Sequence, residues 1–309
     1  MTPEPDTQLT SQGSCSGFEI RAAFPFATLR SGPGRPLEID ERVGLSADGA
    51  PLLSWRARAD NPFEGRLLRT HDGFAFWTND AGWFVVGGDG RSVTMEAAPP
   101  TLRRELRLFG VPISLCSLAR GDLSIHAAAI EVNGAGILFA GPSKYGKTTL
   151  AGAFAAAGHR LLAEDTAHCS LDGGPTVFPG PAAIRLRTDV ASSLQVPGRI
   201  DADGDPGRVA IVLDPSVRGS AAGVPLRAVL FLRGGDGDVT LEHRPVTDAI
   251  RDLFALTFHL ATAESRSAVF ARVAHLCAAV DMVDLRRPLR LDALPDVIRR
   301  VEDLVSVRS

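Results

Sequence analysis

The sequence predicts an α/β (α+β) fold with a small β-rich domain at its N-terminus. Three observations support this prediction: short apolar runs separated by turn residues fill positions 17–100, strand-like and helix-like segments mix after position 101, and a glycine-rich stretch at 141–148 stands between a strand-like and a helix-like segment. The chain has 309 residues, of which 45% are hydrophobic, so it can bury a full-sized core.

The first domain is expected at 17–100. Strand-like runs occupy 18–20, 52–55, 74–77, 83–86 and 93–95, and residues 79–80 and 87–90 supply turns between the last three. Residues 1–16 are polar, contain Pro3 and Pro5, and are predicted to form a disordered leader. Trp55, Trp77 and Trp83 all lie in the first domain, where core packing is the favoured interpretation and an aromatic binding face is the alternative.

The second domain is expected at 101–309. Residues 102–118 carry apolar side chains at helical spacing, interrupted at Pro112, and should connect the two domains. Strands are predicted at 136–140, 160–163, 209–213 and 228–232, and helices at 147–157, 247–258 and 268–280. Residues 189–220 are rich in Gly, Asp, Arg and Pro, which predicts a mobile surface loop around one strand.

Composition argues against several classes of partner and site. With 22% charged residues and a formal net charge of -3, the chain shows no electrostatic attraction to nucleic acid or to an anionic membrane surface. No signal peptide or membrane span is apparent, so a cytoplasmic protein is expected. The cysteines and histidines are scattered without CxxC or HExxH spacing, which indicates neither a disulfide framework nor a transition-metal site. The oligomeric state stays open, a homo-oligomer included.

The glycine-rich stretch matches the pattern G-x-x-x-x-G-K-[ST] of a phosphate-binding P-loop. Glycines let backbone N–H groups converge on phosphate oxygens, and the positive end of the following helix favours an anion. Lys147 is expected to reach the β and γ phosphates, and the hydroxyl of Thr148 is expected to bind Mg²⁺. ATP and Mg²⁺ are therefore the predicted cofactors. The predicted nucleotide-binding residues are Gly141, Pro142, Ser143, Lys144, Tyr145, Gly146, Lys147, Thr148 and Thr149.

A phosphoryl-transfer site also needs carboxylates, because the metal must be oriented and the attacking hydroxyl must lose a proton. Glu164 and Asp165 end the predicted strand at 160–163, while Asp214 ends the strand at 209–213 and precedes a proline. Adjacent acids suit a division of labour, so the pair is preferred over Asp214. Which acid is the base and which is the metal ligand stays open; the arrangement to be tested has Asp165 mainly holding metal and Glu164 mainly accepting the proton.

Three segments together resemble the kinase domain of the HPr kinase/phosphorylase family, including its relatives that tailor lasso peptides. They are Leu-Ser-Ile-His-Ala-Ala-Ala at 123–129, the P-loop, and Gly-His-Arg-Leu-Leu-Ala-Glu-Asp at 158–165. The resemblance covers about 123–260 and leaves out the N-terminal hundred residues. It implies a P-loop core similar to that of phosphoenolpyruvate carboxykinase, and phosphorylation of a serine hydroxyl on a peptide or small protein.

The resemblance also implies roles for individual residues. His126 matches the family histidine beside the catalytic acids, and Glu164 and Asp165 match a pair that usually reads Asp-Asp. Arg185 resembles an arginine that follows a Gly-Pro turn in these relatives. Arg208 and Arg233 are further candidates for neutralising charge in the transition state. The set of candidate catalytic residues is therefore His126, Lys147, Glu164, Asp165, Arg185 and Arg208, with Thr148, Glu164 and Asp165 as metal ligands.

The expected function is an ATP- and Mg-dependent serine kinase acting on a peptide or small protein. The C-terminal signature of the bifunctional enzymes of carbohydrate regulation is missing, which favours a peptide-tailoring relative, such as a lasso-peptide precursor kinase, over a kinase of HPr itself. Two alternatives stay open. One is a kinase of a small-metabolite hydroxyl, because the acceptor pocket has no motif, and the other is a non-catalytic nucleotide-binding switch.

Overall fold

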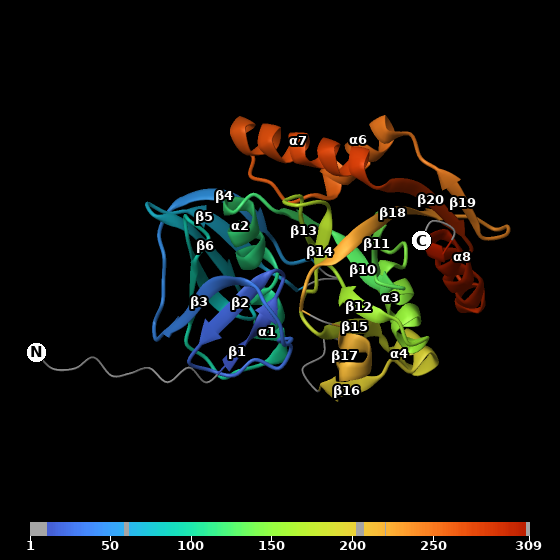
Figure 1. Ribbon diagram of the computed structural model, residues 1–309. Helices are drawn as coiled ribbons and strands as arrows, with labels where there is room; N and C mark the ends of the chain where they lie inside the picture. Colours follow the sequence, from blue (N-terminus) through green and yellow to red (C-terminus); the bar gives the residue numbers. More distant parts are fainter. Residues whose placement is uncertain (1–10, 59–61, 202–206, 220, 307–309) are drawn as a thin grey trace, which may run out of the picture.

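The computed structural model describes residues 11–58, 62–201, 207–219 and 221–306. Within these ranges the chain forms an N-terminal sheet of eight strands, a core sheet of nine and a small sheet of three. The N-terminal sheet and the core sheet lie side by side, and helices cover the core sheet (Figure 1). The protein is thus a mixed α/β fold with a large N-terminal β-sheet.

The N-terminal sheet has the strand order β1-β2-β3-β8-β7-β6-β5-β4. All five strands predicted in this region are present, as β2, β4, β6, β7 and β8. The interpretation of 1–16 as a leader is wrong for 11–15, which pair with β2 as strand β1, while 1–10 lie outside the described residues. The strands are β1 (Ser11–Cys15), β2 (Phe18–Ala22), β3 (Arg35–Arg42), β4 (Ala50–Trp55), β5 (Gly65–Arg69), β6 (Gly73–Thr78), β7 (Gly82–Gly87) and β8 (Ser92–Glu96).

The connecting segment forms two helices, α1 (Leu102–Leu108) and α2 (Val111–Ala119), where one interrupted helix was expected. The break falls at Gly110, and Pro112 stands in the first turn of α2, where a missing N–H costs nothing. Leu108, Ile113 and Cys116 are buried in the same cluster as the N-terminal sheet. These helices therefore pack with the first domain. The domain boundary expected at residue 100 lies before them and so would assign them to the second domain.

The tryptophans are only partly core residues. Trp55 packs against the N-terminal core and meets Phe76 edge to face at 5.8 Å between ring centroids. Trp77 and Trp83 are half-buried, and the guanidinium of Arg66 lies 4.6 Å and 5.9 Å from their rings. The core interpretation thus holds for one face of Trp55 and is wrong for Trp77 and Trp83.

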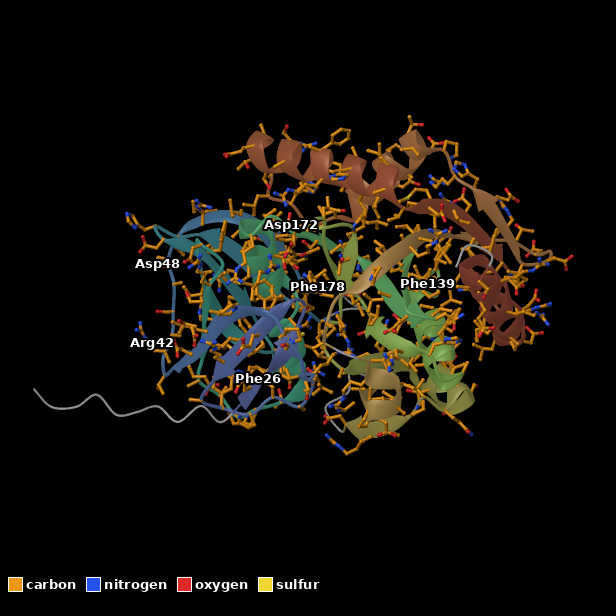
Figure 2. The ribbon with its side chains drawn as sticks, viewed as in Figure 1. Phe26, Arg42, Asp48, Phe139, Asp172 and Phe178 are labelled. Atoms are coloured by element: carbon orange, nitrogen blue, oxygen red, sulfur yellow. The ribbon has the colours of Figure 1, made fainter. Side chains whose placement is uncertain are left out.

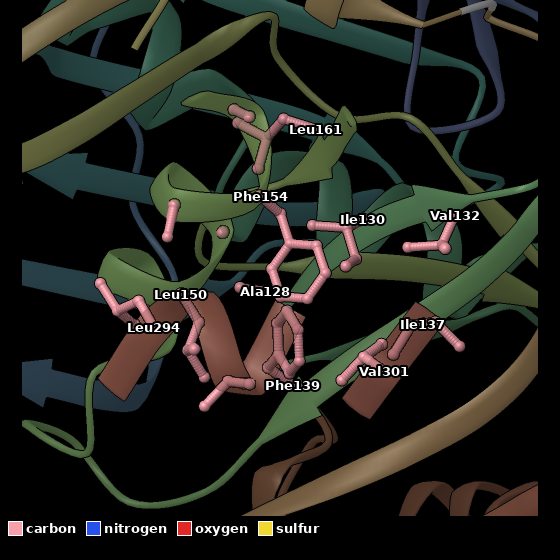
Figure 3. Close-up of a cluster of buried hydrophobic side chains, with 14 of the residues drawn as sticks. Ala128, Ile130, Val132, Ile137, Phe139, Leu150, Phe154, Leu161, Leu294 and Val301 are labelled. Carbon is pink, nitrogen blue, oxygen red and sulfur yellow. The ribbon is translucent and has the colours of Figure 1, made fainter. Parts of the chain in front are cut away.

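The core sheet runs β12-β10-β11-β18-β14-β13-β9, with β20 beside β18 and β19 beside β20. Alternation along its strands sends side chains to both faces: Phe139 belongs to one buried cluster and the neighbouring Leu138 to the other. Figure 3 shows the first cluster, with Phe139 against Phe154. The strands are β9 (Leu123–Ile125), β10 (Ala127–Val132), β11 (Ala135–Ala140), β12 (Arg160–Ala163), β13 (Ala167–Ser170), β14 (Thr176–Phe178), β18 (Val224–Gly234), β19 (Thr240–His243) and β20 (Asp281–Arg287).

Helices lie on both faces of the core sheet, as a buried sheet requires. Helices α3 (Lys147–Ala156) and α8 (Leu294–Ser306, preceded by the 3₁₀ turn Leu291–Ala293) pack on the face that contains Phe139. Helices α6 (Val246–Leu256) and α7 (Ala263–Ala279) pack on the other face. The helix predictions at 147–157, 247–258 and 268–280 are confirmed, although α7 starts five residues earlier than expected.

The strand predicted at 209–213 is confirmed as β17 (Arg208–Leu213), but the mobile loop expected around it at 189–220 is wrong. The described residues there also contribute α4 (Thr188–Leu194), β16 (Gly198–Asp201) and α5 (Pro215–Arg218). Strand β17 pairs with β16 and with β15 (Ala183–Arg187), so the polar residues of β16 are ordered by pairing across the sheet rather than by a hydrophobic pattern of their own. Residues 202–206 and 220 lie outside the described residues.

The two domains share a hydrogen-bonded seam. The backbone N–H of Ser16 donates to Pro179 at 2.7 Å, and that of Ala182 donates to Thr28 at 2.9 Å. Arg30 is 2% exposed and donates to the carbonyl oxygens of Gly180 and Leu161 at 2.9 Å and 3.0 Å. Figure 2 places Phe178 at this seam. The N-terminal domain is therefore fixed against the strands that carry the candidate acids.

The four cysteines are buried thiols, and burial raises the pKa of Cys15, Cys116 and Cys169 to about 12. A thiol with such a pKa is protonated and unreactive at neutral pH, which agrees with a structural role. No helix within the described residues is long and apolar enough to span a membrane.

Candidate active site

The P-loop connects strand β11 to helix α3, as its sequence context predicts. Gly146 is the N-cap of α3 with φ of 79°, a left-handed conformation that favours glycine. A Cβ at this position would stand 2.5 Å from Nη2 of Arg287. Because glycine has no side chain to cap the helix, the first N–H groups of α3 are available to an anion.

Lys147 lies inside the curve of the loop. Its ammonium donates to the carbonyl oxygens of Gly141 and Pro142 at 2.8 Å and 3.2 Å, and the residue is 7% exposed. Burial lowers the pKa of Lys147, and the charge of Asp165 opposes that effect. The Lys147 ammonium is therefore held inside the loop by its carbonyl oxygens.

Arg287 also contacts the loop, although no sequence motif marks this residue. It ends strand β20, is 3% exposed, and donates through Nη2 to the carbonyl oxygen of Tyr145 at 3.0 Å. Within the described part of the chain, its Nε has no hydrogen-bond partner. A buried cation with spare donor capacity beside a P-loop can serve a phosphate or ribose oxygen.

His126 and Asp165 come together as the resemblance implies. His126 lies between β9 and β10, and its Nδ1 is 3.4 Å from Oδ1 of Asp165. The side chains are 40% and 53% exposed, so both are accessible to a substrate. The backbone N–H of His126 donates to the carbonyl oxygen of Leu256 at 2.7 Å, which fixes the backbone of this residue.

Glu164 faces a different partner from its neighbour, because the chain turns after β12. Its Oε2 is 3.2 Å from Nε of Arg185, and its side chain is 9% exposed. Burial raises the pKa of Glu164, and the guanidinium of Arg185 opposes that effect, with a smaller contribution from Arg208. Arg208 in turn donates to the carbonyl oxygen of Arg185 at 3.2 Å. Arg185 and Arg208 therefore both act on Glu164, whereas the partner of Asp165 is His126.

A cavity of about 440 Å³ opens at the histidine–aspartate pair. We call it the acceptor-side cavity. Its core-domain wall includes Ser124, His126, Asp165 and Arg185. Its other wall comes from the N-terminal domain and includes Trp55, Phe63, Phe76, Leu106 and Val111. The aromatic residues that the sequence placed in the first domain thus reach the candidate active site, at a sequence distance that no local pattern reveals.

A second cavity, of about 240 Å³, lies along the P-loop itself. We call it the loop-side cavity. Lys144, Gly146 and Thr149 line it from the loop, and Arg287 and Leu289 line it from the segment after β20. Leu289 is 59% exposed, so its side chain is accessible from this cavity.

Two sequence candidates lie elsewhere. Asp214 is exposed after the end of β17 and is not among the described residues that line either cavity, whereas Asp165 lines the acceptor-side cavity. Arg233 lies near the end of β18 and forms ion pairs with Asp252 and Asp284 at 3.2 Å and 2.9 Å. That network also contains Arg244 and ties α6 to the sheet, so Arg233 has a structural role.

The residues present fit a Mg-nucleotide. The described residues contain no cluster of three or more His, Cys, Asp or Glu that could hold a metal alone. Mg²⁺ in nucleotide sites usually keeps several waters and is bound by one or two carboxylates plus phosphate oxygens. Thr148 in the first turn of α3 and the adjacent acids supply such a set.

Comparison with known proteins shows a similarity to a solved structure. No family model and no curated protein matches the chain. Among solved structures, the chain is similar to the Hpr(Ser) kinase/phosphatase from Coxiella burnetii, with 11% sequence identity over 60% of this chain and 99% of that chain, at a TM-score of 0.33. A similarity of this size does not by itself assign a function, so the assignment depends on the site residues.

Proposed function

We propose that the protein is an ATP- and Mg-dependent phosphotransferase that phosphorylates a serine hydroxyl of a peptide or small protein. One observation carries the proposal: the acceptor-side cavity opens at Asp165, an accessible carboxylate whose Oδ1 lies 3.4 Å from Nδ1 of His126. A phosphate bound by Lys147 would then have a carboxylate and room for an acceptor beside it.

The residues suggest a direct transfer. The hydroxyl oxygen of the acceptor bonds to the γ phosphorus, its proton passes to Asp165, and the bond from that phosphorus to the bridging oxygen breaks, so that ADP leaves with the electron pair. His126 orients the carboxylate of Asp165. Lys147 neutralises phosphate charge. When bound through Thr148 and Glu164, Mg²⁺ would shield the phosphate charge further.

This division of roles differs from the sequence expectation. Glu164 is held by Arg185 and is nearly buried, whereas Asp165 is half-exposed and lines the acceptor-side cavity. We therefore assign proton transfer to Asp165. Glu164 keeps Arg185 in place and is the acid left for the metal side of the site.

The loop-side cavity is the proposed place for the nucleoside. Thr149 and Gly146 line it at the start of α3, so a triphosphate leading from it along the loop would bring its γ phosphate toward Asp165. The exposed Leu289 offers an apolar surface to a base.

The test is turnover of Mg-ATP with a serine-containing peptide. Lys147→Ala is expected to lower both phosphate transfer and background ATP hydrolysis by about 10²–10³-fold, because a charge contact made in the transition state is lost. Arg266→Ala, on the exposed surface of α7, is the control and should turn over ATP at the wild-type rate. Circular dichroism checks that each variant folds.

Three outcomes would contradict the proposal. Wild-type turnover by Lys147→Ala would exclude the P-loop as the phosphate site. Transfer to a sugar or another small alcohol but to no peptide would indicate a metabolite kinase. Tight Mg-ATP binding without transfer to any hydroxyl would indicate a nucleotide-binding switch.

A further inference from the structure

The acceptor-side cavity is larger than a serine side chain requires, and its two walls differ in chemistry. Its volume of about 440 Å³ falls in the range of pockets that bind whole small ligands. The core-domain wall carries the reacting groups His126 and Asp165, whereas the N-terminal wall is mainly aromatic and aliphatic. The wall opposite the reacting groups is therefore built to bind an apolar group.

The aromatic residues of this wall are held in place. Trp55 is half-buried and rests edge to face on Phe76, which is itself 2% exposed. Phe63 lies under the guanidinium of Arg107 at 4.3 Å, and Arg107 binds both carboxylate oxygens of Asp80 at 2.7–3.1 Å. Preorganised rings of this kind can bind a side chain without a large cost in side-chain entropy.

The opposite side of the cavity is fixed as well. Residues after α6 pair with strand β9, since the backbone N–H of Phe258 donates to Ser124 at 2.8 Å and Thr257 forms a bridge with Ile125. The hydroxyl of Ser124 already bonds to Nδ1 of His168 at 3.0 Å. The charged side chains of the lining are also engaged by the protein: Arg103 and Arg107 pair with Asp80, and Arg185 pairs with Glu164. A polar metabolite would have to compete with these partners for hydrogen bonds away from the catalytic pair.

A strand edge leads to the same cavity. Strand β4 ends the N-terminal sheet, pairs only with β5 among the described strands, and finishes at Trp55. Its side chains are mostly exposed, and Leu53 is 39% exposed. An extended peptide can add to such an edge through main-chain hydrogen bonds, while alternate side chains enter neighbouring pockets.

We infer that the acceptor is an extended peptide in which a large apolar or aromatic side chain lies next to the phosphorylated serine, and that the wall of Trp55, Phe63 and Phe76 binds this side chain. The inference rests on the proposed function and names the substrate class of the same site. The N-terminal domain then selects the sequence around the serine, and the core domain performs the transfer.

The test compares acceptors on the full chain with Mg-ATP. The acceptors are nine-residue peptides with a central serine and either Phe or Gly immediately before or after it, together with N-acetylserine amide. We expect kcat/KM to be at least tenfold higher for a peptide with Phe at one of the two positions than for its Gly counterpart. Trp55→Ala should reduce that preference to less than threefold.

Trp83→Ala is the matched control, because Trp83 is half-buried on β7 and does not belong to the described lining of the cavity. It should keep the preference for Phe. Phe63→Ala is a second variant in case Trp55→Ala fails to fold, and it should lose the preference as well.

The outcomes separate this inference from the proposed function. Equal kcat/KM for the Phe and Gly peptides, or an unchanged preference in both Trp55→Ala and Phe63→Ala, would overturn the inference and leave the kinase intact. Hydrolysis of ATP with transfer to no peptide would also overturn it. Absence of any ATP turnover would instead overturn the proposed function, and this inference with it.

Discussion

His168 should make the protein less stable in mild acid. It lies on β13, is 1% exposed, and its Nδ1 is 3.0 Å from the hydroxyls of both Ser117 on α2 and Ser124 on β9. Burial lowers the pKa of His168 from 6.5 to about 4. The neutral imidazole thus joins a helix of the N-terminal domain to the strand that leads into His126.

The sign and size follow from proton linkage. Between pH 6.5 and 4 the unfolded chain binds a proton at His168 that the folded chain does not, so the free energy of unfolding falls as the pH falls. At about 1.4 kcal/mol for each pH unit, the full effect is about 3 kcal/mol. Roughly 2 kcal/mol of it should be lost between pH 7 and pH 5.

The assay is urea unfolding at pH 7, 6 and 5 for the wild type, His168→Gln and His71→Gln. His71 is 96% exposed in its side chain and serves as the control. All other groups titrate alike in the three proteins, so the wild type and His71→Gln should each lose roughly 2 kcal/mol more than His168→Gln over this range. Parallel losses in wild type and His168→Gln would refute the reasoning. If His168→Gln does not fold, an NMR titration of the wild type decides, because the His168 imidazole signal should not move above pH 5.

Three further predictions concern the site and its frame. Asp165→Asn should lower transfer by about 10²–10⁴-fold while keeping the affinity for Mg-ATP, whereas Glu164→Gln should weaken Mg-ATP binding. Turnover assays and calorimetry measure these effects. The opposite pattern would assign metal binding to Asp165 and proton transfer to Glu164. Leu289→Asn, which adds no charge, should weaken ATP binding about tenfold and leave tripolyphosphate binding unchanged, since the leucine contacts only the nucleoside in our proposal. Asp284→Ala should lower the free energy of unfolding by roughly 1–3 kcal/mol, because the buried Arg244 loses one of its two carboxylate partners and keeps only Asp252; a loss below about 0.5 kcal/mol in urea unfolding would show that the pair is not coupled.

The sequence predicts the phosphate loop well because the signal is local. The strand, the glycines, Lys147 and the helix lie within 135–156, and the structure reproduces them nearly residue for residue. The meeting of His126 with Asp165 and of Arg185 with Glu164 agrees with the resemblance, since strand order brings these residues together. Arg287 could not be predicted, because its contact with Tyr145 joins positions 142 residues apart and no motif marks it.

The errors have a common physical cause. Strand β1 is polar and exists through its pairing with β2, and strand β16 is polar and exists through its pairing with β17. Neither has the hydrophobic periodicity on which a sequence-based prediction depends. The aromatic wall of the acceptor-side cavity is a related case: Trp55 looks like a core residue in its own strand, and its second face acquires a role only when the core domain stands opposite it.

The seam between the domains explains how two walls of different origin can hold one substrate. Arg30 of the N-terminal domain donates to Leu161 on β12, three residues before Glu164, and to Gly180, which precedes the strand of Arg185. Burial lowers the pKa of Arg30 to about 10, so the side chain stays charged at neutral pH and its carbonyl partners remain essential. A shift of the N-terminal domain would therefore move the aromatic wall together with strand β12, which precedes both acids. Acceptor choice can change through the exposed faces of Trp55 and Phe63 without disturbing the geometry that transfers phosphate.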